Sequence, residues 1–92
     1  MLNYRLSKQA LKSLSKIEKS DKNLARRIDQ KIVQLREQEI TGEALQGASD
    51  YSKVRVGKYR IISTVRDNML WVYIIEKRES VYQTFQHFLR NV

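Results

Sequence analysis

Two β-strands and the tight turn between them are predicted by residues 51–66, which read YSKVRVGKYRIISTVR. The stretch is rich in β-branched and aromatic residues, and its apolar and polar side chains alternate as they do in a strand. Gly57-Lys58 suits a two-residue turn with glycine first, so the two halves are predicted to pair as an antiparallel hairpin. In that register Arg55 lies directly opposite Arg60, on the same face of the sheet.

Upstream of this hairpin, the spacing of the apolar residues changes to that of a helix. Residues 2–6 alternate as a short strand, and residues 7–37 carry apolar side chains at helical spacing along one face. A break at Ser20-Asp21 divides the longer stretch, which is therefore predicted to form a helical hairpin. Residues 40–50 contain two glycines and several short polar residues, and they are predicted to form a loop.

Downstream, residues 69–77 predict another strand after a turn at Asp67-Asn68. Ser80 and Gln83 resemble a capping box, so the last helix is predicted to begin at Ser80. The resulting order is β-α-α-β-β-β-α over a single domain, residues 1–92. This order predicts an α+β fold in which the helical hairpin packs on one face of an antiparallel sheet.

The composition excludes several classes of site. The 92 residues include no cysteine and one histidine, so a disulfide framework, a cysteine-based zinc site and a two-histidine acid–base pair are excluded. No apolar run reaches the length of about 18 residues that a membrane span needs, and no signal peptide is apparent. We therefore expect a cytoplasmic protein without a membrane partner. The net charge of +8 predicts an anionic partner such as nucleic acid.

One face of the predicted sheet collects cations and aromatic rings. The first hairpin places Tyr51, Lys53, Arg55, Arg60 and Ile62 on this face. The second hairpin is predicted to place Trp71, Tyr73 and Ile75 beside Thr64, Ile62 and Arg60. Two arginines opposite each other repel by up to ~1 kcal/mol, and an RNA phosphate between them would remove that repulsion. Alternatively, Arg55 and Arg60 point apart into water on an exposed face of the sheet. Bases stack on aromatic rings, so Tyr51, Trp71 and Tyr73 are candidate RNA contacts. Alternatively, Trp71 and Tyr73 cover the sheet.

Two stretches, KVRVGKYRII at 53–62 and KRESVY at 77–82, resemble the RelE/ParE superfamily of toxins from type II toxin–antitoxin systems. Leu45 and Gly47 resemble the L-x-G element that precedes the first stretch in that superfamily. The resemblance implies a RelE-like fold across the chain and a cognate antitoxin as the partner in a hetero-oligomer. It also implies one of two activities. RelE-type toxins cleave messenger RNA, usually on the ribosome, whereas ParE-type toxins inhibit DNA gyrase by binding.

The basic residues of RelE-type toxins are matched in this sequence. The resemblance implies that Lys53 and Arg55 activate the 2′-hydroxyl and bind phosphate, and that Arg60 stabilises the transition state. It implies that Arg78 assists the leaving 5′-oxygen and that Tyr82 stacks on a base or orients the RNA.

The sequence departs from the superfamily pattern at two positions. Lys77 replaces the histidine of H-R-x-x-V-Y, and Ser63 stands where a tyrosine is common. We expect Lys77 to bind RNA. The lysines along the first helix are predicted to form a solvated face or to contact ribosomal RNA phosphates; they are Lys8, Lys12, Lys16 and Lys19.

The carboxylates are scattered along the sequence, so we expect no metal ion or other cofactor. Arginine transfers protons poorly, which makes Lys53 the first candidate base, with a pKa lowered by neighbouring cations. Glu79 is the alternative base, or else it pairs with Arg78 or lies as a charge in the first helical turn. The sequence therefore predicts a toxin that is a metal-independent endoribonuclease, cleaving messenger RNA on the ribosome by 2′-hydroxyl attack. The alternatives are a ParE-like gyrase inhibitor and an inactive RNA-binding relative.

Overall fold

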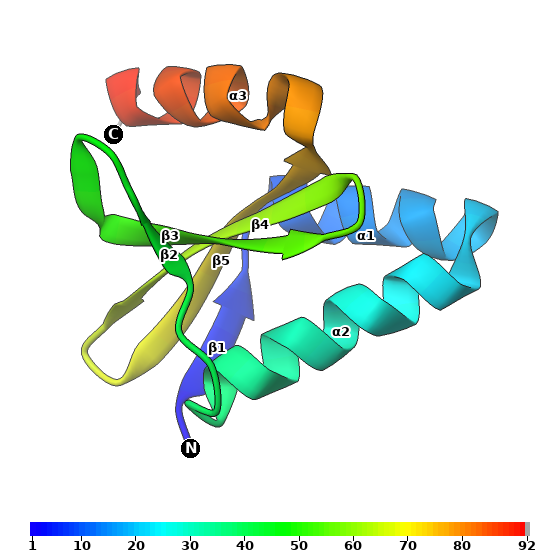
Figure 1. Cartoon of the computed structure of the whole chain (residues 1–92), viewed down its shortest axis with the longest axis horizontal. Helices are drawn as coiled ribbons and strands as arrows, with labels where there is room; N and C mark the ends of the chain where they lie inside the picture. The colour runs from blue at the N-terminus through cyan, green and yellow to red at the C-terminus, as the bar shows by residue number, and fades with distance from the viewer. Residues whose placement is uncertain (92) are drawn as a thin grey trace.

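The structure of the protein is a computed structural model that describes residues 1–91. Three helices and five strands form the chain (Figure 1). In chain order they are β1 (Asn3–Leu6), α1 (Lys8–Ser20), α2 (Lys22–Arg36), β2 (Glu43–Leu45), β3 (Ala48–Val56), β4 (Tyr59–Arg66), β5 (Met69–Lys77) and α3 (Arg78–Arg90). Among residues 1–91, no helix is long and apolar enough to cross a membrane.

The five strands form one sheet in the order β1-β5-β4-β3-β2. The α+β fold and the antiparallel pairing of β3, β4 and β5 are confirmed. Two details differ from the prediction. β1 pairs with β5 in parallel, which makes the sheet mixed, and β2 lies within the stretch predicted to be a loop. Because β2 has only three residues and a register shift, it lacks the alternation that marks a strand in sequence.

The β3–β4 hairpin has the predicted register. Arg55 pairs with Arg60, and the turn between them places Gly57 at φ 58°, where an L-residue with a side chain is strained. The turn is joined to the start of α3, because the backbone N–H of Arg78 donates to the carbonyl of Lys58 at 2.9 Å. This hydrogen bond brings the end of β5 next to the tip of the hairpin.

The β4–β5 pairing contains a bulge that the sequence did not reveal. Ile62 pairs with Ile74 and Ser63 with Val72, so Tyr73 is the extra residue on β5. The predictions that Tyr73 lies beside Ile62 and Ile75 beside Arg60 are therefore each wrong by one residue, because Ile62 pairs with Ile74 and Arg60 with Glu76. Tyr73 and Ile74 consequently both contribute to the same apolar cluster.

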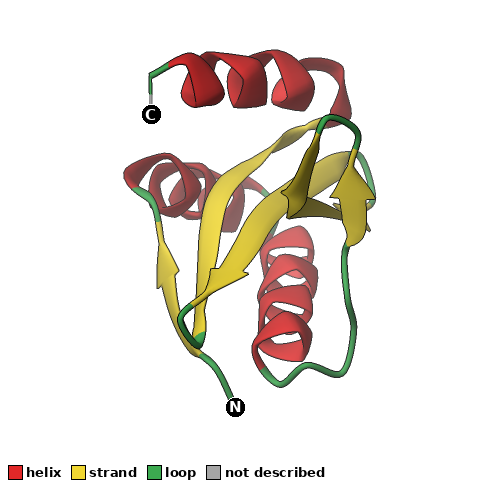
Figure 2. Cartoon of the chain, turned by 90° about the vertical axis from the view of Figure 1, so that its left-hand side faces the viewer, coloured by secondary structure: helices red, strands yellow, loops and turns green. Residues whose placement is uncertain are grey.

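Helices cover both faces of the sheet (Figure 2). As predicted, the α1–α2 hairpin packs on one face, and its core contains Leu2, Ala10, Ile17, Ala25, Ile28, Ile32, Leu35, Val54, Val56, Ile61, Leu70, Val72 and Ile75. On the opposite face, α3 packs over a second cluster, which contains Leu45, Tyr51, Ile62, Ile74, Val81 and Phe85. The second face is therefore covered by α3 along its aromatic part.

The three helices begin in different ways. Ser7 caps α1 by accepting a hydrogen bond from the Ala10 N–H at 3.0 Å, and Asp21 caps α2 through the Leu24 N–H at 3.1 Å. The predicted start of α3 at Ser80 is wrong, because the helix begins at Arg78 directly after β5 without a side-chain cap. Arg78 therefore belongs to the first turn of α3.

Candidate functional site

Three arginines meet at the tip of the β3–β4 hairpin. They line a pocket of about 220 Å³, which we call the arginine pocket; its lining residues are Arg55, Gly57, Lys58, Arg60, Arg78 and Glu79. The paired strands supply Arg55 and Arg60, and the first turn of α3 supplies Arg78. The hydrogen bond between Arg78 and Lys58 holds the two parts of the pocket together.

Arg60 is fixed in the arginine pocket by its own turn. Its side chain is 8% exposed, and Nη1 donates to the carbonyls of Gly57 at 3.1 Å and Tyr59 at 2.9 Å. Within residues 1–91, its Nε and Nη2 groups donate to no other residue. The guanidinium is thus held in place with donors still available, as bidentate recognition of a phosphate requires.

The charges in the arginine pocket are not compensated by ion pairs. In the described part of the chain, the only ion pair within 4.0 Å joins Lys53 to Glu43, so none involves an arginine. Glu79 lies in the first turn of α3 and lines the pocket, but it makes no such contact with Arg78. Of the interpretations of Glu79, the ion pair with Arg78 is therefore wrong. The pocket can accept an anion that relieves the repulsion between its arginines.

Lys53 and Tyr82 form a hydrogen-bonded pair beside the arginine pocket. The Lys53 ammonium donates to the Tyr82 hydroxyl at 3.1 Å and lies 5.2 Å from the centroid of its ring. This hydrogen bond raises the pKa of Lys53, and electrostatic attraction to Tyr82 and Glu43 raises it further. Desolvation and the charge of Arg60 act in the opposite direction. The predicted lowering of the Lys53 pKa by its cationic neighbours is wrong, because the Tyr82 hydrogen bond outweighs them.

The Lys53–Tyr82 pair borders a second pocket. This pocket measures about 430 Å³ and lies between α3 and the β2–β3 segment. Lys53 and Arg55 are two residues apart on β3, so their Cα atoms are about 7 Å apart on one face of the sheet. The five predicted catalytic residues line these two pockets. Lys53 and Tyr82 line the larger one, and Arg55, Arg60 and Arg78 line the arginine pocket.

Glu43 is a neighbour of this site that the sequence reasoning missed. Its Oε1 lies 4.0 Å from the Lys53 ammonium, and its side chain is 77% exposed. Glu43 belongs to β2, which the sequence predicted to be a loop, and it pairs with Lys53 across the β2–β3 register. Only the presence of this edge strand could have revealed the contact.

Comparison with known proteins identifies the family of this chain. The profile of the ParE toxin family of the type II toxin–antitoxin system parDE matches residues 4–82. The chain belongs to this family. The predicted membership of the RelE/ParE superfamily is confirmed, and the protein is a toxin of a type II toxin–antitoxin system. No curated protein sequence matches the toxin significantly.

Solved toxin structures share the fold of this toxin. The YoeB dimer from Staphylococcus aureus superposes with a TM-score of 0.73 at 23% identity, over 84% of this chain and 97% of that one. Isolated RelE from E. coli superposes with a TM-score of 0.73 at 21% identity, over 97% of this chain and 99% of that one. The matching chain of the intact E. coli RelBE toxin–antitoxin complex superposes with a TM-score of 0.72 at 21% identity, over 84% of this chain and 96% of that one. These matches establish the RelE-like fold.

The aromatic residues that were predicted to bind RNA do not line the arginine pocket of the toxin. Tyr51 is 8% exposed and packs against Phe85, with ring centroids 5.1 Å apart, so the predicted stacking of Tyr51 on RNA is contradicted. Tyr73 packs against Phe88 at 4.8 Å, which agrees with its alternative role in covering the sheet. The sequence missed this because it did not show that α3 lies over these rings.

Trp71 and Lys77 occupy other parts of the toxin surface. Trp71 stacks on Tyr73 at 5.9 Å and pairs with Thr64 in the sheet, and Arg5 lies 5.9 Å from its ring. Glu76 is the residue of β5 that pairs with Arg60, and Trp71 lies five residues from Glu76, or about 17 Å along the strand. Trp71 is therefore far from the arginine pocket. Lys77 is exposed at the end of β5 and lines pockets on the other side of the sheet.

The side chains that commonly bind metal ions are dispersed. Across the described residues 1–91, no group of three or more His, Cys, Asp or Glu side chains lies close enough to hold a metal ion. His87 lies near the end of α3, with its ring nitrogen 3.3 Å from the Asn91 amide. It lines neither the arginine pocket nor the pocket beside Lys53.

Proposed function

We propose that this toxin is a metal-independent endoribonuclease that cleaves messenger RNA. The observation that carries the proposal is the arginine pocket, where Arg55, Arg60 and Arg78 converge without an acidic partner within 4.0 Å. Three arginines that meet without an ion pair repel one another, so the arrangement favours an anionic substrate. A phosphodiester in the transition state of cleavage carries the charge that such a cluster stabilises best.

Arg60 is the proposed stabiliser of the transition state. Its hydrogen bonds to Gly57 and Tyr59 hold it in place before substrate binds, so little reorganisation is needed during the reaction. Arg55 and Arg78 would bind the non-bridging oxygens of the phosphate. Arg78 also lies in the first turn of α3, where the helix dipole adds positive potential.

The proposed proton transfers use Glu79 and Lys53. Glu79 is the only carboxylate that lines the arginine pocket, and it would accept the proton from the 2′-hydroxyl as that oxygen attacks phosphorus. The raised pKa keeps Lys53 protonated, which argues against Lys53 as base. The protonated ammonium would instead donate a proton to the leaving 5′-oxygen, which binds a proton more tightly than an amine does. The P–O5′ bond breaks, and the products are a 2′,3′-cyclic phosphate and a 5′-hydroxyl.

The substrate and partner follow from the same features. The arginine pocket is small, so accurate positioning of a flexible RNA must come from elsewhere, and the ribosome would supply it. A toxin with net charge +8 also suits an acidic antitoxin, and the RelBE structure is a toxin–antitoxin complex of the same fold. We therefore propose that a cognate antitoxin binds this chain in a hetero-oligomer.

A second candidate function is inhibition of DNA gyrase by binding alone. The match to the ParE family profile is the observation that favours it. This function requires no phosphate-sized cluster of arginines, and it gives the remaining donors of Arg60 no ligand. For this reason the ribonuclease proposal accounts for more of the structure.

The test is to express the toxin without antitoxin and map the 5′ ends of cellular RNA. We expect new 5′-hydroxyl ends within coding regions, and we expect Arg78→Gln to abolish both these ends and the toxicity. Arg90→Gln is the matched control, because Arg90 is an exposed arginine at the other end of the same helix. Intact transcripts together with accumulating DNA breaks would instead establish the gyrase function.

A further inference from the structure

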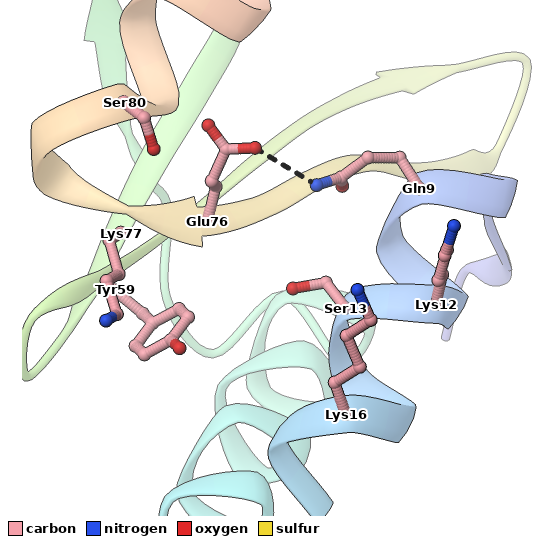
Figure 3. Close-up of a pocket in the computed structure, with 8 residues that line it drawn as sticks. All are labelled: Gln9, Lys12, Ser13, Lys16, Tyr59, Glu76, Lys77 and Ser80. Atoms are coloured by element: carbon pink, nitrogen blue, oxygen red, sulfur yellow. Dashed lines mark hydrogen bonds between the residues drawn. The ribbon is translucent and has the colours of Figure 1, made fainter.

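A second cationic pocket lies beside the junction of β5 and α3 (Figure 3). It measures about 420 Å³ and contains three lysines, so we call it the lysine pocket. Lys12 and Lys16 of α1 lie on one side of it, and Lys77 lies on the other side next to Tyr59. None of the predicted catalytic residues lines it.

The walls of the lysine pocket are held by hydrogen bonds between α1 and β5. β1 pairs with β5 only as far as Val72, which leaves the edge of β5 open beyond that point. There the Gln9 amide accepts from the Ile75 N–H at 3.1 Å and donates to the Ile75 carbonyl at 3.3 Å. The Ser13 hydroxyl donates to the same carbonyl at 2.6 Å. This face of α1 is therefore fixed against the sheet.

The lysine pocket carries positive charge that the protein does not neutralise. Glu76 is its only acidic lining residue, and its carboxylate accepts hydrogen bonds from Gln9 at 3.4 Å and from Thr84. Throughout residues 1–91, Lys12, Lys16 and Lys77 make no ion pair within 4.0 Å. Three ammonium groups outnumber the one carboxylate around this cavity, and the remaining positive charge predicts an anionic ligand.

The lysine pocket and the arginine pocket are neighbours through consecutive residues. Lys77 lines the first and Arg78 lines the second, and these residues join β5 to α3. Tyr59 of the lysine pocket likewise follows Lys58 of the arginine pocket. The two pockets therefore lie on either side of the junction between β5 and α3.

We infer that the lysine pocket binds a backbone phosphate of the same RNA strand whose scissile phosphodiester occupies the arginine pocket. This inference rests on the proposed ribonuclease function and extends it to the nucleotides that flank the cleavage site. It separates the four lysines of α1 into two pairs. Lys12 and Lys16 contact the RNA backbone, whereas Lys8 and Lys19 line neither pocket. The contact involves phosphate alone, so it carries no base preference.

The experiment measures binding of uncleavable RNA by the whole toxin over a series of salt concentrations. RNA methylated at every 2′-hydroxyl lacks the nucleophile and stays intact, and fluorescence anisotropy reports its affinity. We expect Lys12→Gln/Lys16→Gln to weaken binding of a long oligomer and to reduce the slope of log K against log salt by about 0.7 for each phosphate that the variant no longer binds. Binding of a dinucleotide, which fills the arginine pocket alone, should stay unchanged.

The matched control is Lys8→Gln/Lys19→Gln, which removes the same charge from the same helix. Equal effects of the two double variants on affinity and slope would overturn the inference. Arg78→Gln separates this failure from that of the ribonuclease proposal, because it should weaken RNA of both lengths. If Arg78→Gln also leaves RNA binding unchanged, the proposed function fails too. Loss of antitoxin binding with unchanged RNA binding in Lys12→Gln/Lys16→Gln would assign the pocket to the protein partner and overturn the inference.

Discussion

Replacing Arg60 by glutamine tests the proposed chemistry most directly, because the structure gives this arginine two separable roles. Its Nη1 donates to the carbonyls of Gly57 and Tyr59, and the rest of the guanidinium faces the arginine pocket. A glutamine amide can replace one of these hydrogen bonds but carries no charge. The substitution should therefore affect stability modestly and cleavage strongly.

The two effects can be estimated separately. A hydrogen bond from a charged donor contributes about 1.5–3 kcal/mol, so losing one of the two should lower the free energy of unfolding by about that amount. A small domain of ordinary stability, roughly 5 kcal/mol or more, stays folded after such a loss. Removing a preorganised donor at the transition state costs a factor of about 10²–10³ in rate.

The assay follows cleavage of messenger RNA in a translating extract, with stability measured by urea unfolding of the same protein. We expect Arg60→Gln to be folded at assay temperature and to cleave about 10²–10³-fold more slowly, as for the loss of an oxyanion-stabilising donor. Arg66→Gln is the control, since Arg66 is an exposed arginine of the same strand that lies outside the arginine pocket. A folded Arg60→Gln variant that cleaves at the wild-type rate would refute the role of Arg60.

Three further substitutions have defined outcomes. Tyr82→Phe removes the hydrogen bond that raises the pKa of Lys53, so NMR titration should find a lower pKa for Lys53 in this variant. In the wild type, the stability that this bond contributes is present below the ordinary lysine pKa of 10.5 and is lost as the pH rises through the raised pKa. Phe85→Ala should lower the free energy of unfolding by about 3–5 kcal/mol in urea, and Phe85→Leu by less, because the ring is buried against Tyr51. Gly57→Ala should cost about 1–2 kcal/mol by thermal unfolding, and Gly57→Asn less, because φ at Gly57 is 58°; equal stability of wild type and Gly57→Ala would contradict this.

Local sequence determined the elements with strong patterns. Alternation in residues 51–66 and the glycine at the turn were enough to predict the β3–β4 register, including Arg55 opposite Arg60. Helical spacing predicted α1 and α2, and Ser7 and Asp21 cap them as short polar side chains do. The motifs at 53–62 and 77–82 were sufficient for the toxin superfamily, because they span the residues that meet at the arginine pocket.

Tertiary structure alone decided which of those residues are accessible and how they are charged. The bulge at Tyr73 and the packing of α3 bury Tyr51, since contacts between distant segments leave no periodic signal in the sequence. The pKa of Lys53 rises because Tyr82 lies 29 residues away in the chain but 3.1 Å away in space. Sequence therefore determined which chemical groups the toxin has, and the packing of α3 determined which of them face an anion, because burial and charge depend on neighbours that only the fold brings together.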